Sequence, residues 1–264
     1  MKIADSHSHI FPAPLAEKAT QSISQFYEIP MTNVASAEVL LQQEKEAGIE
    51  VTLVCNSAVS ASQVPSINRF IAEECKAHPE FIGLGSVFPG MDGWEEELDA
   101  LCAYGLKGIK IHPDFQKHYI DDADGIPLYR ECAKRGLVVL FHMGDNRYDF
   151  STPQRLLNLK RQVPDLIAIS AHFGGYQAWD EALTMPVLDG IYYDTSSSLM
   201  FIDEDRAKRI MDRFGTERFL FGVDFPMWTP KEELQRFLNF PLGLSQSEKE
   251  NILYNNFAKL FLEN

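Results

Sequence analysis

Two histidines, His7 and His9, are separated by a single residue in the segment ADSHSHIF, which covers residues 4–11. In a β-strand, side chains two residues apart point to the same face, so Asp5, His7 and His9 would line one side of a strand. An imidazole is costly to bury without a partner, and two on one face therefore require either water or a metal ion. The pair alone does not separate these two cases, so the rest of the chain has to decide.

Three further histidines and one aspartate follow later apolar segments: His112, His142, His172 and Asp224. If those segments are parallel strands, their carboxyl ends meet at one rim and bring these side chains near the first pair. Three imidazoles and a carboxylate suit zinc, and manganese or iron would also fit such a set. A water at an open position on the ion has a lowered pKa and can act as a nucleophile. The pattern predicts one divalent metal ion, zinc in first place.

Eight short apolar segments recur along the chain, at residues 2–10, 50–57, 81–89, 105–113, 136–144, 165–175, 190–198 and 218–226. Their continuous apolar runs are typical of strands in parallel sheets, which helices cover. Helix-start signals lie between them, at Ser36, Asp92, Thr152, Thr229 and Ser245. Alternation of strand and helix eight times over this length predicts an α/β fold, a (β/α)8 TIM barrel that forms a single domain over residues 1–264.

A doubly wound parallel sheet is the alternative fold. No glycine-rich phosphate-binding fingerprint follows the first apolar segment, which argues against it. The longest insert between strands, residues 11–35, contains phenylalanine, tyrosine and proline. We expect this insert to form a lid beside the first strand.

Composition limits the partners of the protein. The net charge of −14 and the pI of about 4.9 disfavour nucleic acid and anionic membrane surfaces, because both require clustered lysine and arginine. No apolar run approaches the roughly 18 residues that span a bilayer, and the first residues do not resemble a secretion signal. The four cysteines are scattered, as expected for reduced thiols. We therefore expect a cytoplasmic protein with no nucleic-acid or membrane partner.

The ordered motifs resemble the amidohydrolase superfamily: DSHSH at residues 5–9, His142, AHFGG at 171–175 and FGVDFP at 221–226. GLKGIKIHP at 105–113 and ILYNNFAKLF at 252–261 resemble, more narrowly, the amidohydrolase-2 group. That group contains metal-dependent hydrolases, lactonases and decarboxylases of the aminocarboxymuconate-semialdehyde type. The resemblance covers essentially the whole chain, and it implies a TIM barrel.

The resemblance also implies roles for the site residues. His7, His9, His142 and Asp224 would hold the metal, and His172 would orient or deprotonate the water bound to it. Asp224 would share that catalytic work. A histidine outside the metal shell is chemically suited to the task, since it exchanges protons near neutral pH.

Lys110 has two interpretations. It shares a strand face with His112, at a place where binuclear amidohydrolases carry a carboxylated lysine that bridges two metal ions. In that case His142 and His172 would bind the second ion. The interpretation that we rank first is a mononuclear site, with Lys110 uncarboxylated and attracting an anionic substrate.

Further candidates for the substrate pocket fall in loops that follow strands. Arg147 is expected to clamp a substrate carboxylate, because its planar fork matches one. His112 is expected to contact substrate beside Lys110. Weaker candidates are Asn56, Asp145, Asn146, Tyr148, Ser196, Ser197 and Trp228. His78 and His118 are expected to be exposed to solvent.

Three functions are consistent with these residues. The first is a metal-dependent hydrolase that attacks a small ester, lactone or amide with a metal-activated water. The alternative is a metal-dependent, non-oxidative decarboxylase of a small aromatic or enoic acid, and the third is a metal-dependent binding protein without catalysis. Hydrolysis ranks first because the decarboxylases of this group tend to be longer chains. The resemblance alone suggests a homodimer acting on a small-molecule substrate.

Overall fold

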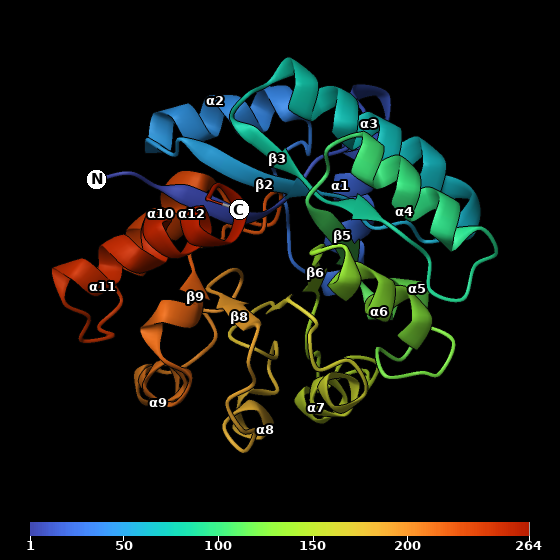
Figure 1. The fold of residues 1–264 in the computed structure, drawn as a ribbon. Helices are drawn as coiled ribbons and strands as arrows, with labels where there is room; N and C mark the ends of the chain where they lie inside the picture. The colour runs from blue at the N-terminus through green and yellow to red at the C-terminus, as the bar shows by residue number, and fades with distance from the viewer. Residues whose placement is uncertain (264) are drawn as a thin grey trace.

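Short parallel strands of buried residues form the centre of the computed structural model, which describes residues 1–263 (Figure 1). Each of the eight predicted apolar segments contains a strand. The strands are β1 (Ala4–His9), β2 (Val51–Cys55), β3 (Phe81–Gly83), β4 (Gly85–Ser86), β5 (Gly108–Ile111), β6 (Val138–Phe141), β7 (Ala168–Ser170), β8 (Ile191–Asp194) and β9 (Phe219–Leu220). β3 and β4 are two parts of one predicted segment, so the nine strands occupy eight positions.

The strands pair in parallel in the orders β1-β2-β3 and β4-β5-β6-β7-β8-β9. The ring closes between β1 and the segment that follows β9. There the backbone N–H of His9 donates to the carbonyl of Phe225 at 2.8 Å, and that of Asp224 donates to the carbonyl of His7 at 2.6 Å. The closed ring of parallel strands confirms the predicted (β/α)8 barrel.

Helices surround the ring and follow most of the strands (Figure 1). They are α1 (Ala13–Tyr27), α2 (Ala37–Ala47), α3 (Val64–Ala77), α4 (Trp94–Ala103), α5 (Pro113–Gln116), α6 (Ile126–Lys134), α7 (Pro153–Gln162), α8 (Trp179–Ala182), α9 (Glu204–Phe214), α10 (Pro230–Asn239), α11 (Gln246–Glu250) and α12 (Asn256–Phe261). Two 3₁₀ turns, Ala61–Gln63 and Thr216–Arg218, and one π-helical turn, Asn251–Asn255, complete them.

Four of the five predicted helix starts are confirmed by side-chain caps: Ser36, Thr152, Thr229 and Ser245. Each places a hydroxyl where it accepts an otherwise unpaired N–H of the first helical turn. The prediction for Asp92 is wrong. α4 begins at Trp94 after Gly93, whose φ of +76° turns the chain, and no side chain caps this helix.

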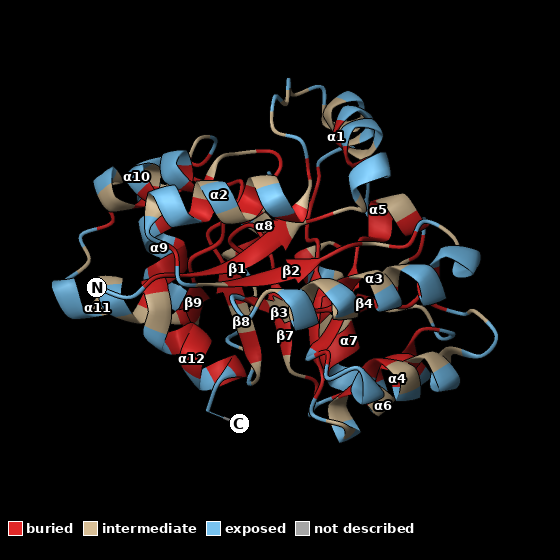
Figure 2. Cartoon of the chain, turned by 90° about the horizontal axis from the view of Figure 1, so that it is seen from above, coloured by how far each residue is buried: buried red, intermediate tan, exposed pale blue. Residues whose placement is uncertain are grey.

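Successive residues of a strand point alternately into the barrel and out toward the helices, so the buried apolar side chains form two clusters. Val138 and Leu140 of β6 pack in an inner cluster, whereas Val139 and Phe141 belong to the outer cluster beneath the helices. The inner cluster also includes residues of α12. Figure 2 shows α12 and α1 at opposite ends of the strands. Apolar residues of α12 therefore pack at the amino end of the barrel, and the carboxyl end is left for polar chemistry.

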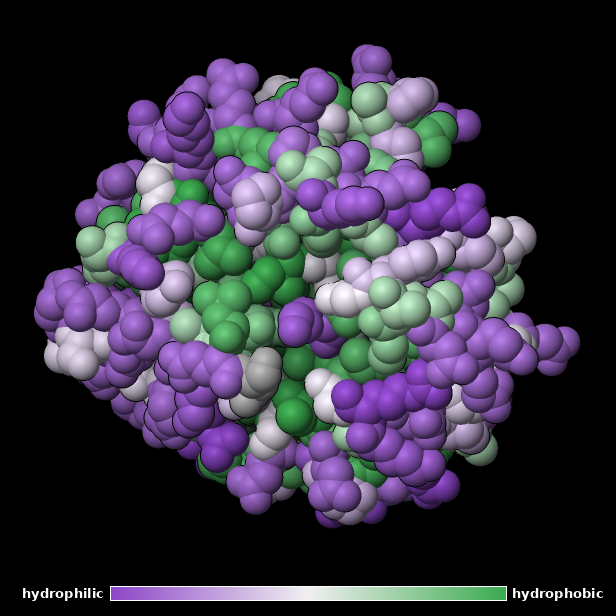
Figure 3. All heavy atoms as spheres, turned by 45° about the horizontal axis from the view of Figure 1, so that its top comes forward, coloured by the Kyte–Doolittle hydropathy of each residue, from purple (hydrophilic) through white to green (hydrophobic). Residues whose placement is uncertain are grey.

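The face of the molecule shown in Figure 3 is mainly polar. On this face, hydrophilic residues cover most of the periphery, and hydrophobic residues gather near the centre of the view. Among the described residues, the helices are too short or too polar for any of them to cross a membrane.

Helix α2 is joined to β2 by a buried carboxyl group. The hydroxyl of Thr52 donates to Glu44, and both residues are buried. Burial raises the pKa of Glu44 well above its ordinary value of 4.5, and the charge of Asp5 raises it further. A raised pKa in the folded state means that stability is fully present below the unfolded pKa and is lost as the pH rises through the folded pKa.

Glu44→Gln is therefore expected to stabilise the fold at alkaline pH, because the amide removes a buried charge. The melting temperature should rise by a few degrees at pH 9 and change little at pH 4. For a chain of this size, each kcal/mol of added unfolding free energy raises it by about 2–4 °C. Calorimetry across this pH range measures it. Glu46→Gln, at an exposed position of the same helix, is the control. A stabilisation by Glu44→Gln that is the same at every pH would contradict the explanation.

Candidate active site

The predicted chemical residues meet at the carboxyl end of the barrel. His7 and His9 lie on β1. His142 directly follows β6, His172 comes shortly after β7, and Asp224 follows β9. His172 and Asp224 have φ angles of +60° and +65°, which residues other than glycine rarely adopt. Such conformations cost about 1–3 kcal/mol each and gather at functional sites. The barrel thus holds these side chains at an energetic cost.

Asp224 lies close to two of the other predicted metal ligands. The Oδ1 atom of Asp224 lies 3.6 Å from Nε2 of His7 and 3.5 Å from Nε2 of His9. Two ligands about 2.1 Å from a tetrahedral ion lie about 3.4 Å apart, so this spacing fits one shared divalent cation. Asp224 is also kept charged: burial raises its pKa, but His7 and His9 together bring it well below 3.8. A metal fits this donor set.

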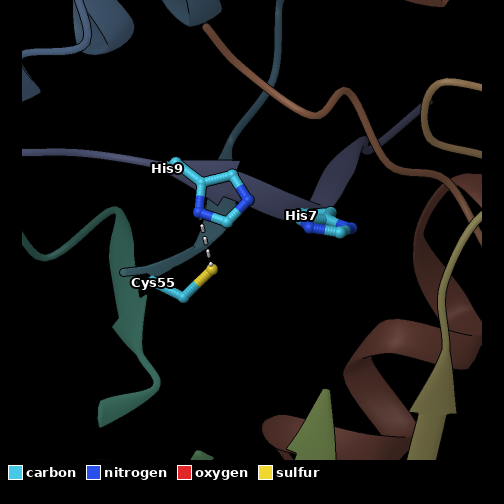
Figure 4. A group of neighbouring side chains, drawn as sticks. All are labelled: His7, His9 and Cys55. Carbon is cyan, nitrogen blue, oxygen red and sulfur yellow. Dashed lines mark hydrogen bonds between the residues drawn. The ribbon is translucent and has the colours of Figure 1, made fainter. Parts of the chain in front are cut away.

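Hydrogen bonds behind the histidines fix the ring atoms that face Asp224. Nδ1 of His7 lies 2.9 Å from Oδ2 of Asp194, so it carries the proton and Nε2 keeps its lone pair. On His9, the outer Nδ1 lies 3.6 Å from the sulfur of Cys55, whose thiol donates to the carbonyl of Ser8. Figure 4 shows His7 and His9 on the same strand with the Cys55 sulfur facing His9.

Asp194 is a central residue that the sequence analysis did not identify. Its carboxylate accepts bonds from the side chain of His7, the backbone N–H of His172 at 2.9 Å and the hydroxyl of Ser196. Burial raises the pKa of Asp194, but His7, His172 and Ser196 together outweigh this and lower it below 3.8. One signal was present in the sequence: Asp194 directly follows the apolar residues 191–193, as Asp224 directly follows the apolar run that ends at Val223.

His142 and His172 form a hydrogen-bonded pair. Nδ1 of His142 lies 3.0 Å from Nε2 of His172, and Nδ1 of His172 lies 3.0 Å from the carbonyl of Ser196. This chain leaves Nε2 of His142 with no hydrogen-bond partner among residues 1–263. Its nearest carboxylate is Asp114, at 3.3 Å. His142 therefore faces the cavity, but its free atom points toward a carboxylate other than Asp224.

Asp114 was not predicted as a site residue. Both of its carboxylate oxygens are buried, and neither has a hydrogen-bond partner within the described chain. Burial raises the pKa of Asp114 to about 7, and Asp145 adds to the shift. Asp114, His142 and Asp145 form a second group of ligand atoms close enough to hold a cation. The two groups together leave both a mononuclear and a binuclear site open.

Lys110 does not take the place that the sequence suggested. The side chain is completely buried, and Nζ lies 2.9 Å from Nε2 of His7. Burial lowers the pKa of this ammonium group. It does not line the cavity described below, so the expected contact with substrate is not seen. Its position on β5 directs it across the barrel to the metal-ligand atoms instead.

Arg147 is bound to other residues of the chain. Its guanidinium makes a forked pair with Asp145, at 2.9 and 2.7 Å, and donates to the carbonyl of Phe26 at 2.6 Å. It also lies over the ring of Phe26, with 4.6 Å to the ring centre. Arg147 therefore holds the last turn of α1. Asp145 and the carbonyl of Phe26 accept three of its N–H donors, and Arg147 does not line the cavity described below, so the substrate clamp stays a prediction.

Helix α1 is the predicted insert, and it forms one wall of the site. The hydroxyl of Tyr27, its last residue, lies 2.8 Å from Nε2 of His112. The ring of His112 stacks on that of His142 at 4.1 Å between centres. His112 lines the cavity, and its contact with substrate stays a prediction.

A cavity of about 270 Å³ lies between α1 and the barrel. Its walls are mostly apolar, and its lining includes the proposed metal ligands His7, His9 and Asp224. The lining residues are His7, His9, Phe11, Ala19, Ser22, Ile23, Phe26, Tyr27, Asn56, Ser57, Val59, His112, Phe115, His142, Asp224, Pro226 and Met227. His172 instead lines a small recess beside it, together with Tyr176 and Ser197.

Some of the remaining predicted residues lie at the cavity or beside a ligand, and others lie outside the site. Asn56 lines the cavity, and Ser196 binds Asp194 as described above. Ser197 donates to Asp224 and accepts from the indole of Trp228 at 3.1 Å, so this pair supports a metal ligand. Asn146 and Tyr148 are exposed and lie outside the cavity. Two predictions of exposure are wrong: His118 is buried, and His78 is partly buried.

Comparisons with known proteins agree with this arrangement. Among curated proteins, 2-amino-3-carboxymuconate-6-semialdehyde decarboxylase of Dictyostelium discoideum is 24% identical over 235 residues, which cover 72% of this chain and 64% of that protein. The chain thus spans less than two thirds of the length of this relative.

Several solved structures share the fold. An uncharacterized TIM-barrel protein from Bordetella bronchiseptica gives a TM-score of 0.78 at 20% identity, covering 98% of each chain. A 5-carboxyvanillate decarboxylase from Sphingomonas paucimobilis gives 0.74 at 15% identity, again over 98% of each. A dihydroxybenzoic acid decarboxylase from a Polaromonas species, with bound manganese and the inhibitor 2-nitroresorcinol, gives 0.74 at 14% over 98% and 96%.

A family model described as amidohydrolase matches residues 4–262. The match includes every strand of the barrel and all of the residues that meet at its carboxyl end. The chain belongs to the amidohydrolase family.

Proposed function

We propose that the protein is a metal-dependent decarboxylase that releases carbon dioxide from a small aromatic or enoic acid without oxidation. The observation that carries this proposal is the cavity, whose walls are mostly apolar and aromatic and whose lining also includes His7, His9 and Asp224. An apolar ring fits such walls, and its carboxylate would then meet His7, His9 and Asp224. The decarboxylase named among the curated relatives supports this alternative over hydrolysis, which the sequence analysis ranked first.

His7, His9 and Asp224 are the proposed metal ligands, and His142 completes the set expected from the sequence. Burial lowers the pKa of His7 to about 4, and Lys110 adds to the shift, so its imidazole is neutral at pH 7 as a ligand must be. The bound ion would supply positive charge beside the substrate carboxylate. Manganese and zinc both suit this donor set.

The chain itself must supply a proton, because decarboxylation replaces the bond from carbon to carboxylate with a bond to hydrogen. His172 is the proposed donor. It lies in the recess beside the cavity, with Asp224 and Tyr176 as neighbours. Its Nδ1 donates to the carbonyl of Ser196, so Nε2, on the side of His142, is the ring nitrogen that would take up and then deliver the transferred proton.

Hydrolysis of a small ester, lactone or amide is the second candidate. The same ligand group favours it, because a cation there would equally polarise a carbonyl oxygen. The proposed substrate in either case is a small molecule with an anionic or carbonyl group at the histidine end.

The reaction class is testable on the purified protein reconstituted with manganese or zinc. We expect carbon dioxide release from members of a panel of hydroxybenzoates and enoic acids. A parallel panel of esters, lactones and amides should give no product above the metal-free control. Turnover of the second panel alone would replace decarboxylation with hydrolysis.

Replacement of His172 separates proton transfer from metal binding. His172→Asn is expected to lower the rate by about a hundredfold or more, the usual effect of losing an acid–base group, while the metal content stays unchanged. Rates measured across pH and metal counts by mass spectrometry provide the readouts. Ser196→Ala, which keeps the carbonyl that binds His172, is the matched control and should cost much less. Loss of metal in His172→Asn would instead make it a ligand.

Lys110 decides between one and two metal ions. Lys110→Met is expected to raise the affinity for manganese, because the positive charge 2.9 Å from Nε2 of His7 is removed. Equilibrium dialysis measures affinity and stoichiometry together. If the variant instead binds one ion fewer per chain than wild type, Lys110 is carboxylated and bridges two metal ions. An ammonium group could not do this, because it has no lone pair for a cation.

A further inference from the structure

A further group of ligand atoms, distinct from both groups at the active site, lies away from the cavity, just before α6. His118, Asp122 and Asp124 each present one nitrogen or oxygen, and the three atoms lie within 4.8 Å of one another. These residues belong to the segment that connects α5 to α6. None of them lines the cavity at the carboxyl end of the barrel.

His118 is buried but unsatisfied. Only 8% of the residue is exposed, and within residues 1–263 its Nε2 atom has no hydrogen-bond partner. Nε2 lies 3.6 Å from Oδ1 of Asp124, and Nδ1 lies 3.7 Å from Oδ2 of Asp122. Both separations are too long for hydrogen bonds. A buried polar atom without a partner is rare enough to require an explanation.

A protonated His118 between two aspartates would be the simplest explanation. Burial opposes it, because burial lowers the pKa of His118 and the two carboxylates offset this only in part. A neutral imidazole satisfies neither carboxylate. A divalent cation would satisfy all three groups, and the 3.6 Å between Nε2 and Oδ1 matches the spacing of about 3.4 Å between two ligands of a tetrahedral ion.

Two glycines leave room beside these atoms. A Cβ atom at Gly125 would lie 2.9 Å from Nε2 of His118, and one at Gly90 would lie 2.8 Å from Oδ2 of Asp124. Gly125 has φ −81° and ψ −23°, an ordinary helical conformation that any residue can adopt. The backbone conformation at Gly125 therefore does not require glycine. The missing side chain instead leaves open space next to the imidazole of His118.

The charges of the cluster are also uncompensated. The neighbouring Asp121 pairs with Arg155 at 2.8 Å and with Asn158 at 3.0 Å. Over residues 1–263, by contrast, the ion pairs of Asp122 and Asp124 run only to His118. Two carboxylates without a lysine or arginine favour a cation from solution.

We propose that His118, Asp122 and Asp124 form a second divalent-cation site, separate from the proposed active site. One imidazole and two carboxylates suit zinc or a similar transition-metal ion better than calcium, which prefers oxygen ligands alone. Water completes the coordination, since both aspartates are partly exposed. The ion would fasten the segment before α6 to the barrel.

Zinc counts on the intact protein test this site. Wild type and the double variant Asp122→Asn/Asp124→Asn are dialysed against zinc alone, and bound zinc is counted per chain by mass spectrometry. The double variant is expected to bind one zinc fewer than wild type. Its side chains are 47% and 62% exposed, so the fold should tolerate the change, and circular dichroism checks this.

His78→Gln is the matched control. Nε2 of His78 lies 3.6 Å from a single carboxylate, that of Glu74, so it has the same spacing without the second aspartate. Its zinc count should equal that of wild type. Anomalous scattering from wild-type crystals soaked in zinc should show a peak between Nε2 of His118 and Asp124. Equal zinc counts in wild type and the double variant, or no peak at His118, would overturn the proposal whatever reaction the cavity performs.

Discussion

The closure of the barrel is the constraint on which the rest of the structure depends. The hydrogen bond from Asp224 to the carbonyl of His7 joins the last strand segment to the first, across 217 positions of the chain. The same bond sets Asp224 beside His7 and His9. Gly222 allows this close approach, because a Cβ there would lie 3.1 to 3.3 Å from Ser196, Ser6 and His7. The barrel cannot close without assembling the ligand group.

Local patterns were sufficient for much of the fold and part of the site. Apolar periodicity marks each strand, hydroxyl caps mark four helices, and the spacing of His7 and His9 requires only that β1 be a strand. Contacts between distant segments were not readable. Asp194 looks like any strand-ending aspartate until it meets His7, and Arg147 looks like a free cation until Asp145 and the carbonyl of Phe26 occupy it.

The polar groups at the carboxyl end depend on one another in a low-dielectric setting. Asp194 stays ionised although buried because His7 and Ser196 bond to it, and through His7 it fixes the tautomer in which Nε2, facing Lys110, carries the lone pair. The chain from Ser196 through His172 does the same for His142. Each free imidazole nitrogen is therefore set by a group that never reaches the cavity.

Helix α1 is attached to the barrel differently from the helices that cover its sides. It follows β1 as an insert, and its last turn is held by Arg147 and by the bond from Tyr27 to His112. Much of the apolar cavity wall is contributed by this one helix, whereas the ligand atoms all come from the barrel. The apolar wall and the ligand atoms thus come from separable parts of the chain. Changes confined to α1 could reshape what enters the cavity over evolutionary time while the machinery below it is inherited intact.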